Sequence, residues 1–148
     1  MNGTTKARSH WFSPGRWPLA LAFAIGVVSA TLSLISNRLW GTRSLGFPSS
    51  WFLFVLVGSA VFAPLEEWIF RGVILRFLLR FGTVGALVIS SALFAIVHGF
   101  KAEALLGRFA LGLVFGALYL WRHSLWPPIV AHFTHNVLLL SATLFVQH

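Results

Sequence analysis

Five apolar runs account for most of this sequence, and their lengths restrict the kind of fold that the chain can adopt. A hydrocarbon core of about 30 Å is crossed by about 20 helical residues. Charged residues make up 9% of the chain, far below the roughly 25% of a soluble domain, and hydrophobic residues make up 57%. We therefore expect an all-α, polytopic integral membrane bundle, with about five transmembrane helices around a polar intramembrane cavity. The expected helices are Pro18–Ser36, Trp51–Phe81, Gly82–Gly99, Ala104–Trp121 and Ile129 to about Val146.

Basic residues lie at the ends of the apolar runs, where membrane proteins usually carry them. The net charge of +8 is spread in this way and forms no nucleic-acid footprint, so the expected partner is the lipid bilayer and not a nucleic acid. Lys6, Arg8 and Arg16 precede the first run without any acidic residue. This predicts a cytoplasmic N-terminus in a multi-pass protein of the inner or plasma membrane. A cleaved signal peptide is the competing interpretation of the first run.

Local signals refine the expected helices. Pro64 could kink the long second run, which then forms either one helix or two abutting ones. Gly112 and Gly116 are four residues apart and make a small-residue contact face for a neighbouring helix. Trp126-Pro127-Pro128 is a typical helix start, with proline in the first turn. The expected divisions are a basic cytoplasmic segment (residues 1–17), a first transmembrane helix and loop (18–50) and a core (51–146).

Two adjacent carboxylates, Glu66 and Glu67, lie inside the second apolar run, with Arg71 four residues after the latter. A charge at the centre of a membrane costs roughly 2.5–3.5 kcal/mol on insertion scales, so intramembrane carboxylates mark candidate functional sites. In a helix Glu67 and Arg71 share one face and can pair, whereas Glu66 points about 100° away. One carboxylate is thus expected to be structural and the other available for a different partner.

Other polar groups occur at helical spacing in later runs. His98 follows Phe94 by four residues, and Asn136 follows His132 by four. Taken alone, His98 fits a histidine at the membrane interface, and the second pair fits interhelical hydrogen bonding. Because buried polar groups in lipid must find one another, we expect these residues to form one site with the two glutamates. His135 overlaps this face only in part and is not assigned to the site.

The combination of side chains suits amide hydrolysis by water. A glutamate and a histidine can take the proton of a water molecule and orient it, and a second histidine with an asparagine can stabilise the oxyanion. Neither a nucleophilic serine or cysteine nor a cofactor is required, and the chain has no cysteine. A zinc-dependent variant stays open because Glu and two His can ligate zinc, although no HExxH motif is present.

Simple membrane crossings would place the two histidines at different depths. His98 would lie about 24 Å along the third helix, and His132 only about 9 Å into the last one. For them to meet, the chain must reverse after His98 within the bilayer, or the last helix must begin deep. Irregular backbone at that depth is tolerated beside protein or a wet cavity.

Three motifs in this order resemble those of the CPBP (ABI) family of intramembrane proteases, which includes the type II CAAX prenyl endopeptidases. The motifs are Glu66-Glu67-xxx-Arg71, Phe94-xxx-His98 and His132-xxx-Asn136, within EEWIFRG, ALFAIVHG and SLWPPIVAHFTHN. The resemblance covers about Trp51–Phe145.

The resemblance implies roles for these residues. Glu66 and His98 would activate water, and His132 and Asn136 would hold the oxyanion. Glu67, Arg71 and Phe94 match the remaining motif positions and would support the site. The implied activity is an intramembrane endopeptidase acting on a peptide or protein that enters from the membrane or the cytoplasmic side. We expect no cofactor, and a metal requirement stays open.

Two other functional classes remain open. One is a noncatalytic membrane binding protein, such as a bacteriocin-immunity-type protein, that keeps the same polar core. The other is a small ion or proton carrier, in which the carboxylate and histidines form a relay, although the five runs show no internal repeat. A homo-oligomer or a partner subunit is compatible with either class and with the enzyme.

Overall fold

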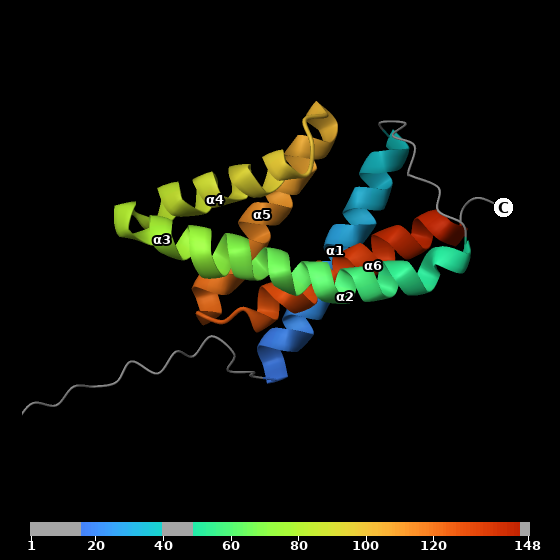
Figure 1. Cartoon of the computed structure of the whole chain (residues 1–148), viewed down its shortest axis with the longest axis horizontal. Helices are drawn as coiled ribbons and strands as arrows, with labels where there is room; N and C mark the ends of the chain where they lie inside the picture. Colours follow the sequence, from blue (N-terminus) through green and yellow to red (C-terminus); the bar gives the residue numbers. More distant parts are fainter. Residues whose placement is uncertain (1–15, 40–48, 146–148) are drawn as a thin grey trace, which may run out of the picture.

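The computed structural model describes residues 16–39 and 49–145, and all elements in these stretches are helical (Figure 1). The expected cytoplasmic segment up to residue 15, residues 40–48 of the expected loop and Val146 lie outside the described residues. The elements are α1 (Arg16–Leu39), η1 (Ser49–Trp51), α2 (Phe52–Glu67), η2 (Trp68–Leu75), α3 (Arg76–Leu78), η3 (Leu79–Phe81), α4 (Thr83–Val97), α5 (Ala102–Arg122) and α6 (Trp126–Phe145).

The run from α2 to η3 is one continuous helix, so the described chain contains five long helices. This confirms the all-α class and the number of helices. Large apolar side chains are exposed on each of them, as expected of a polytopic protein whose surface contacts lipid.

Three of the five helices in the described residues are long and apolar enough to cross a membrane, namely Leu19–Leu39, Phe52–Phe81 and Ala104–Arg122. α4 has 15 residues and is therefore about 22 Å long, short of the hydrocarbon thickness. α6 contains two prolines and several polar residues, and it is not among the three. The five expected helices are therefore present. However, α4 is shorter than a simple membrane span, and α6 contains prolines and polar residues.

Pro64 lies inside α2 without ending the helix. The backbone instead widens into π-helical turns directly after the two glutamates, over the eight residues of η2. Of the two arrangements left open by the sequence, a single helix is thus the observed one. π-Helical turns are rare and often occur at functional sites.

Glycines let two pairs of helices approach closely. A Cβ on Gly112 of α5 would lie 2.9 Å from the Cα of Ser91 in α4, and one on Gly116 would collide with Leu87 of the same helix. The expected small-residue contact face is therefore present. On the opposite side, a Cβ on Gly26 of α1 would lie 2.6 Å from the carbonyl oxygen of Ala131 in α6.

The chain reverses directly after α4, because only residues 98–101 separate α4 from α5 and Gly99 adopts a positive φ of 119°. The two helices form a hairpin, while α6 packs against both α1 and α2 (Figure 1). A short α4 with an immediate reversal is the first of the two arrangements by which His98 and His132 could meet.

Candidate active site

Glu67 and Arg71 form a fully buried ion pair at the centre of the molecule. Arg71 Nη1 donates to Glu67 Oε1 at 2.9 Å, and the two side chains are 1% and 0% exposed. Arg71 Nη2 donates to the carbonyl oxygen of Gly112 at 3.0 Å, which ties the pair to α5. The pairing expected from the four-residue spacing is therefore present.

Glu67 has a second partner that the sequence did not indicate. The Nδ1 atom of His132 lies 2.8 Å from the same oxygen, Oε1, that accepts from Arg71. The two residues are 65 positions apart, so no local spacing could have shown this contact. The buried carboxylate thus links the long helix to α6 through a histidine.

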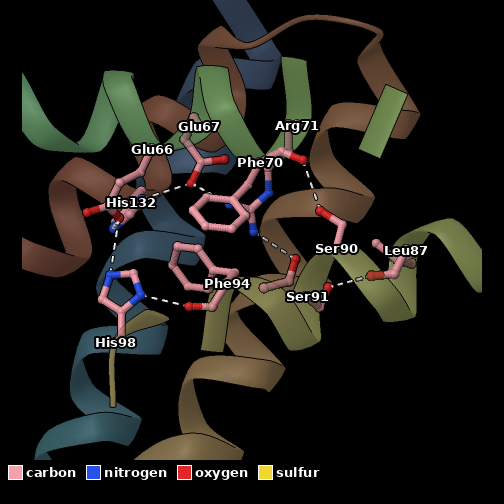
Figure 2. Close-up of polar contacts among 11 residues, drawn as sticks. Glu66, Glu67, Phe70, Arg71, Leu87, Ser90, Ser91, Phe94, His98 and His132 are labelled. Carbon is pink, nitrogen blue, oxygen red and sulfur yellow. Dashed lines mark hydrogen bonds and ion pairs between the residues drawn. The ribbon is translucent and has the colours of Figure 1, made fainter. Parts of the chain in front are cut away.

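Glu66 faces the other way and meets both expected histidines. Its Oε2 atom lies 3.3 Å from His98 Nε2 and 3.6 Å from His132 Nε2. Figure 2 shows the three side chains turned toward one another. Glu66 and His98 remain 26% and 29% exposed, whereas His132 is only 5% exposed. The structure therefore brings together residues from three helical segments around one carboxylate oxygen.

The hydrogen-bond partners of His98 and His132 determine which nitrogen carries the hydrogen when each ring is neutral. His98 Nδ1 lies 2.7 Å from the carbonyl oxygen of Phe94, which can only accept a hydrogen bond. His132 Nδ1 faces the carboxylate of Glu67. Because a neutral imidazole carries one N–H, each neutral ring directs a bare Nε2 toward Glu66. With both rings neutral, three hydrogen-bond acceptors thus converge around Glu66 Oε2.

Phe94 is the aromatic centre of the site. Its ring lies 4.6 Å from that of His98 and 5.7 Å from that of His132, centroid to centroid. The guanidinium carbon of Arg71 lies 4.7 Å from the Phe94 centroid, a cation–π distance. On the far side Phe115 stacks on His132 at 5.0 Å. These rings surround the charged groups with apolar surface and fix the orientation of both imidazoles.

A cavity of about 520 Å³ adjoins this cluster and is bounded by α1, α4, α5 and α6. His98, His132 and Asn136 all line it. Asn136 therefore shares the cavity with the two histidines, but in the described chain no hydrogen bond joins it to the other site residues. Ser29 and His135 also line the cavity, and the sequence analysis assigned neither to the site.

The converging acceptors of Glu66, His98 and His132 are suited to holding a water molecule. Among the described residues no group of three or more His, Cys, Asp or Glu side chains is placed to hold a metal ion. A water molecule, by contrast, can donate to two converging acceptors and keep its oxygen lone pair free.

Comparison with known proteins identifies a protein family. A family model described as type II CAAX prenyl endopeptidase Rce1-like matches residues 48–138, which include all three motifs. Neither the search of curated proteins nor that of solved structures found a match.

Proposed function

Because the chain belongs to the Rce1-like family of type II CAAX prenyl endopeptidases, we propose that it is an intramembrane endopeptidase in which Glu66 and His98 activate water. The observation that carries this proposal is the approach of two imidazole Nε2 atoms to one carboxylate oxygen, at 3.3 and 3.6 Å. The family membership supports a peptide or protein substrate. The catalytic roles are our inference from the contacts.

Glu66 is the general base. A water molecule between Glu66 and His98 donates one hydrogen to the carboxylate and the other to the bare Nε2 atom, which leaves an oxygen lone pair to attack the peptide carbonyl. Glu66 takes the proton as the C–O bond forms. It then delivers that proton to the leaving amine as the C–N bond breaks.

His132 and Asn136 stabilise the oxyanion. The amide of Asn136 can donate directly. His132 donates from Nε2 only when both ring nitrogens are protonated, which places a positive charge between Glu66 and Glu67 at 3.6 and 2.8 Å. Donors aimed at the developing charge typically contribute about 10²–10³-fold to turnover.

Glu67, Arg71 and Phe94 support the reacting groups without contacting the substrate. Glu67 accepts from His132 Nδ1 and so orients that ring, while Arg71 balances the buried carboxylate. Phe94 supplies the carbonyl oxygen that orients His98. This is the general pattern in which outer groups set the tautomer and direction of a catalytic imidazole.

We further place the N-terminus in the cytoplasm, in an inner or plasma membrane, with residues 51–146 as the proteolytic core. The charge bias supports the orientation, because residues 1–17 carry three basic residues and no acidic one.

The activity is tested with the purified full-length chain in detergent. An internally quenched peptide ending in a prenylated Cys-a-a-X sequence is the first substrate, and its unprenylated copy is the second. We expect cleavage of at least one peptide, incorporation of ¹⁸O from labelled water into the new carboxylate, and no loss of activity in the presence of a metal chelator. Folded protein that binds either peptide without cleaving it would contradict the proposal and favour a noncatalytic binding protein.

A further inference from the structure

A partly buried serine–histidine pair joins α1 to α6 next to the proposed active site. His135 is 4% exposed, and its Nδ1 atom lies 3.0 Å from Ser29 Oγ. The Ser29 hydroxyl donates to the carbonyl oxygen of Gly26 at 3.0 Å. α1 lies outside the matched residues 48–138, so this contact is contributed by a helix that the family model does not include.

The pair fixes which ring nitrogen of His135 carries the proton. The carbonyl oxygen of Gly26 can only accept, so it takes the single hydrogen of the Ser29 hydroxyl. Ser29 Oγ must then accept from His135 Nδ1–H for both contacts to be satisfied. The neutral ring therefore keeps Nε2 as a hydrogen-bond acceptor.

The His135 side chain lies in the wall of the cavity. His135 lines the cavity together with His132 and Asn136, which are its neighbours on α6. Ser29 occupies the Nδ1 edge of the ring, and no described side chain bonds to Nε2. Buried polar atoms normally have a hydrogen-bond partner. The atom of His135 left for a ligand is therefore Nε2, which accepts a hydrogen bond.

α1 holds this arrangement rigidly. A Cβ on Gly26 would lie 2.7 Å from Thr134 Cβ and 2.6 Å from the Ala131 carbonyl oxygen, so α1 and α6 are in direct backbone contact one turn from Ser29. The backbone of Ser29 therefore cannot move away from α6 without separating the two helices.

We propose that His135 is a substrate-binding residue whose Nε2 accepts a backbone N–H of the peptide, and that Ser29 is the positioning residue that keeps Nε2 unprotonated. This proposal rests on the proposed endopeptidase function. A peptide supplies backbone N–H donors at regular intervals. One of them lies within reach of α6 when the scissile carbonyl is held by His132 and Asn136 on the same helix.

The first test compares His135→Phe and His135→Gln with the wild type on a peptide that the protein cleaves. Loss of one neutral hydrogen bond is expected to raise KM about 2- to 12-fold in His135→Phe, with little change in kcat. The glutamine variant, whose side-chain oxygen can still accept, is expected to lie between the two. A scan of single N-methyl groups along the peptide should show one sensitive position in the wild type that is no longer sensitive in His135→Phe.

The second test changes the positioning residue. Ser29→Ala removes the acceptor for Nδ1–H and frees the proton to move to Nε2, so KM should rise in the same direction. Thr31→Ala is the matched control, because Thr31 is exposed on the same helix and its hydroxyl bonds only to the carbonyl oxygen of Val27 at 3.0 Å. This control should leave KM unchanged.

An unchanged KM and an unchanged N-methyl profile in folded His135→Phe and Ser29→Ala would overturn the proposal. That result is distinguishable from failure of the endopeptidase function, since the wild type would still cleave the peptide and Glu66→Gln would still be inactive. A fall in kcat alone, with the N-methyl profile intact, would also contradict it, because that is the signature of a general packing defect.

Discussion

His98, His132 and His135 are oriented by the same device. In each ring Nδ1 meets an acceptor supplied by the protein, namely the Phe94 carbonyl oxygen, the Glu67 carboxylate or the Ser29 hydroxyl. Each neutral ring therefore presents Nε2 as an acceptor, toward Glu66 in two cases and at the cavity wall in the third. A fixed tautomer removes one degree of freedom from a site that must orient a water molecule and a peptide together.

Arg71 is the residue whose loss should affect stability most clearly. Arg71→Ala leaves the carboxylate of Glu67, which is 0% exposed, without its cationic partner. Breaking a buried ion pair by removing one partner typically costs about 3–5 kcal/mol. We expect a large fall in the thermal unfolding temperature of the detergent-solubilised protein.

The matched control for Arg71 is Arg80→Ala. Arg80 is exposed, and its guanidinium carbon lies 3.5 Å from the centroid of the Phe77 ring. Loss of an exposed cation–π contact should cost at most about 1 kcal/mol. Equal unfolding temperatures for the two variants would contradict the structural role given to Arg71.

At the scale of helices, the sequence predicted features that depend on local spacing. The Glu67–Arg71 pair and the Gly112/Gly116 contact face both follow from a four-residue repeat on one helix. The contact between His132 and Glu67 does not, because it depends on how α6 crosses the long helix. The π-helical turns after Glu67 also escaped prediction, since apolar composition is the same in an α-helix and in a widened one.

The α4–α5 contact gives a prediction at this scale. Gly112→Ala places a methyl group 2.9 Å from the Ser91 Cα, so the helices must separate, and the carbonyl oxygen that accepts from Arg71 moves with them. Overpacking of this kind typically costs about 1–3 kcal/mol. The variant should unfold at a lower temperature and lose turnover.

Gly85→Ala on α4 serves as the comparison, because nothing lies within 4 Å of a Cβ at that position. It should be neutral or slightly stabilising, as alanine is the better helix former. A Gly112→Ala protein as stable as Gly85→Ala would show that the helices can be separated without cost.

At the scale of the whole molecule, the cavity and the reacting groups are enclosed by helices from both halves of the chain. α1 contributes to the cavity wall although it precedes the matched residues 48–138. The motifs in the sequence therefore predicted which side chains meet around Glu66, but they could not show which helix completes the space beside them. This part of the cavity wall depends on the packing of α1 against α6. No repeat or motif in the sequence predicts that packing.

The proposed orientation can be tested directly because the chain contains no cysteine. Single cysteines at Ser9 and Thr83 should react with a membrane-impermeant thiol reagent only after the membrane is opened. A cysteine at Ser50, at the opposite end of the long helix that precedes Thr83, should react in intact cells. The reverse pattern would place the N-terminus outside the cytoplasm.

The most direct test of the account is the turnover number of Glu66→Gln on a peptide that the wild type cleaves. Glutamine keeps the size of the side chain and one acceptor oxygen but cannot take a proton from water. We expect kcat to fall by about 10²–10⁴-fold with an unchanged unfolding temperature. Glu103→Gln, which changes the remaining acidic residue of the chain, should retain full activity. A Glu66→Gln protein that turns over at the wild-type rate would contradict the claim that this carboxylate activates the attacking water.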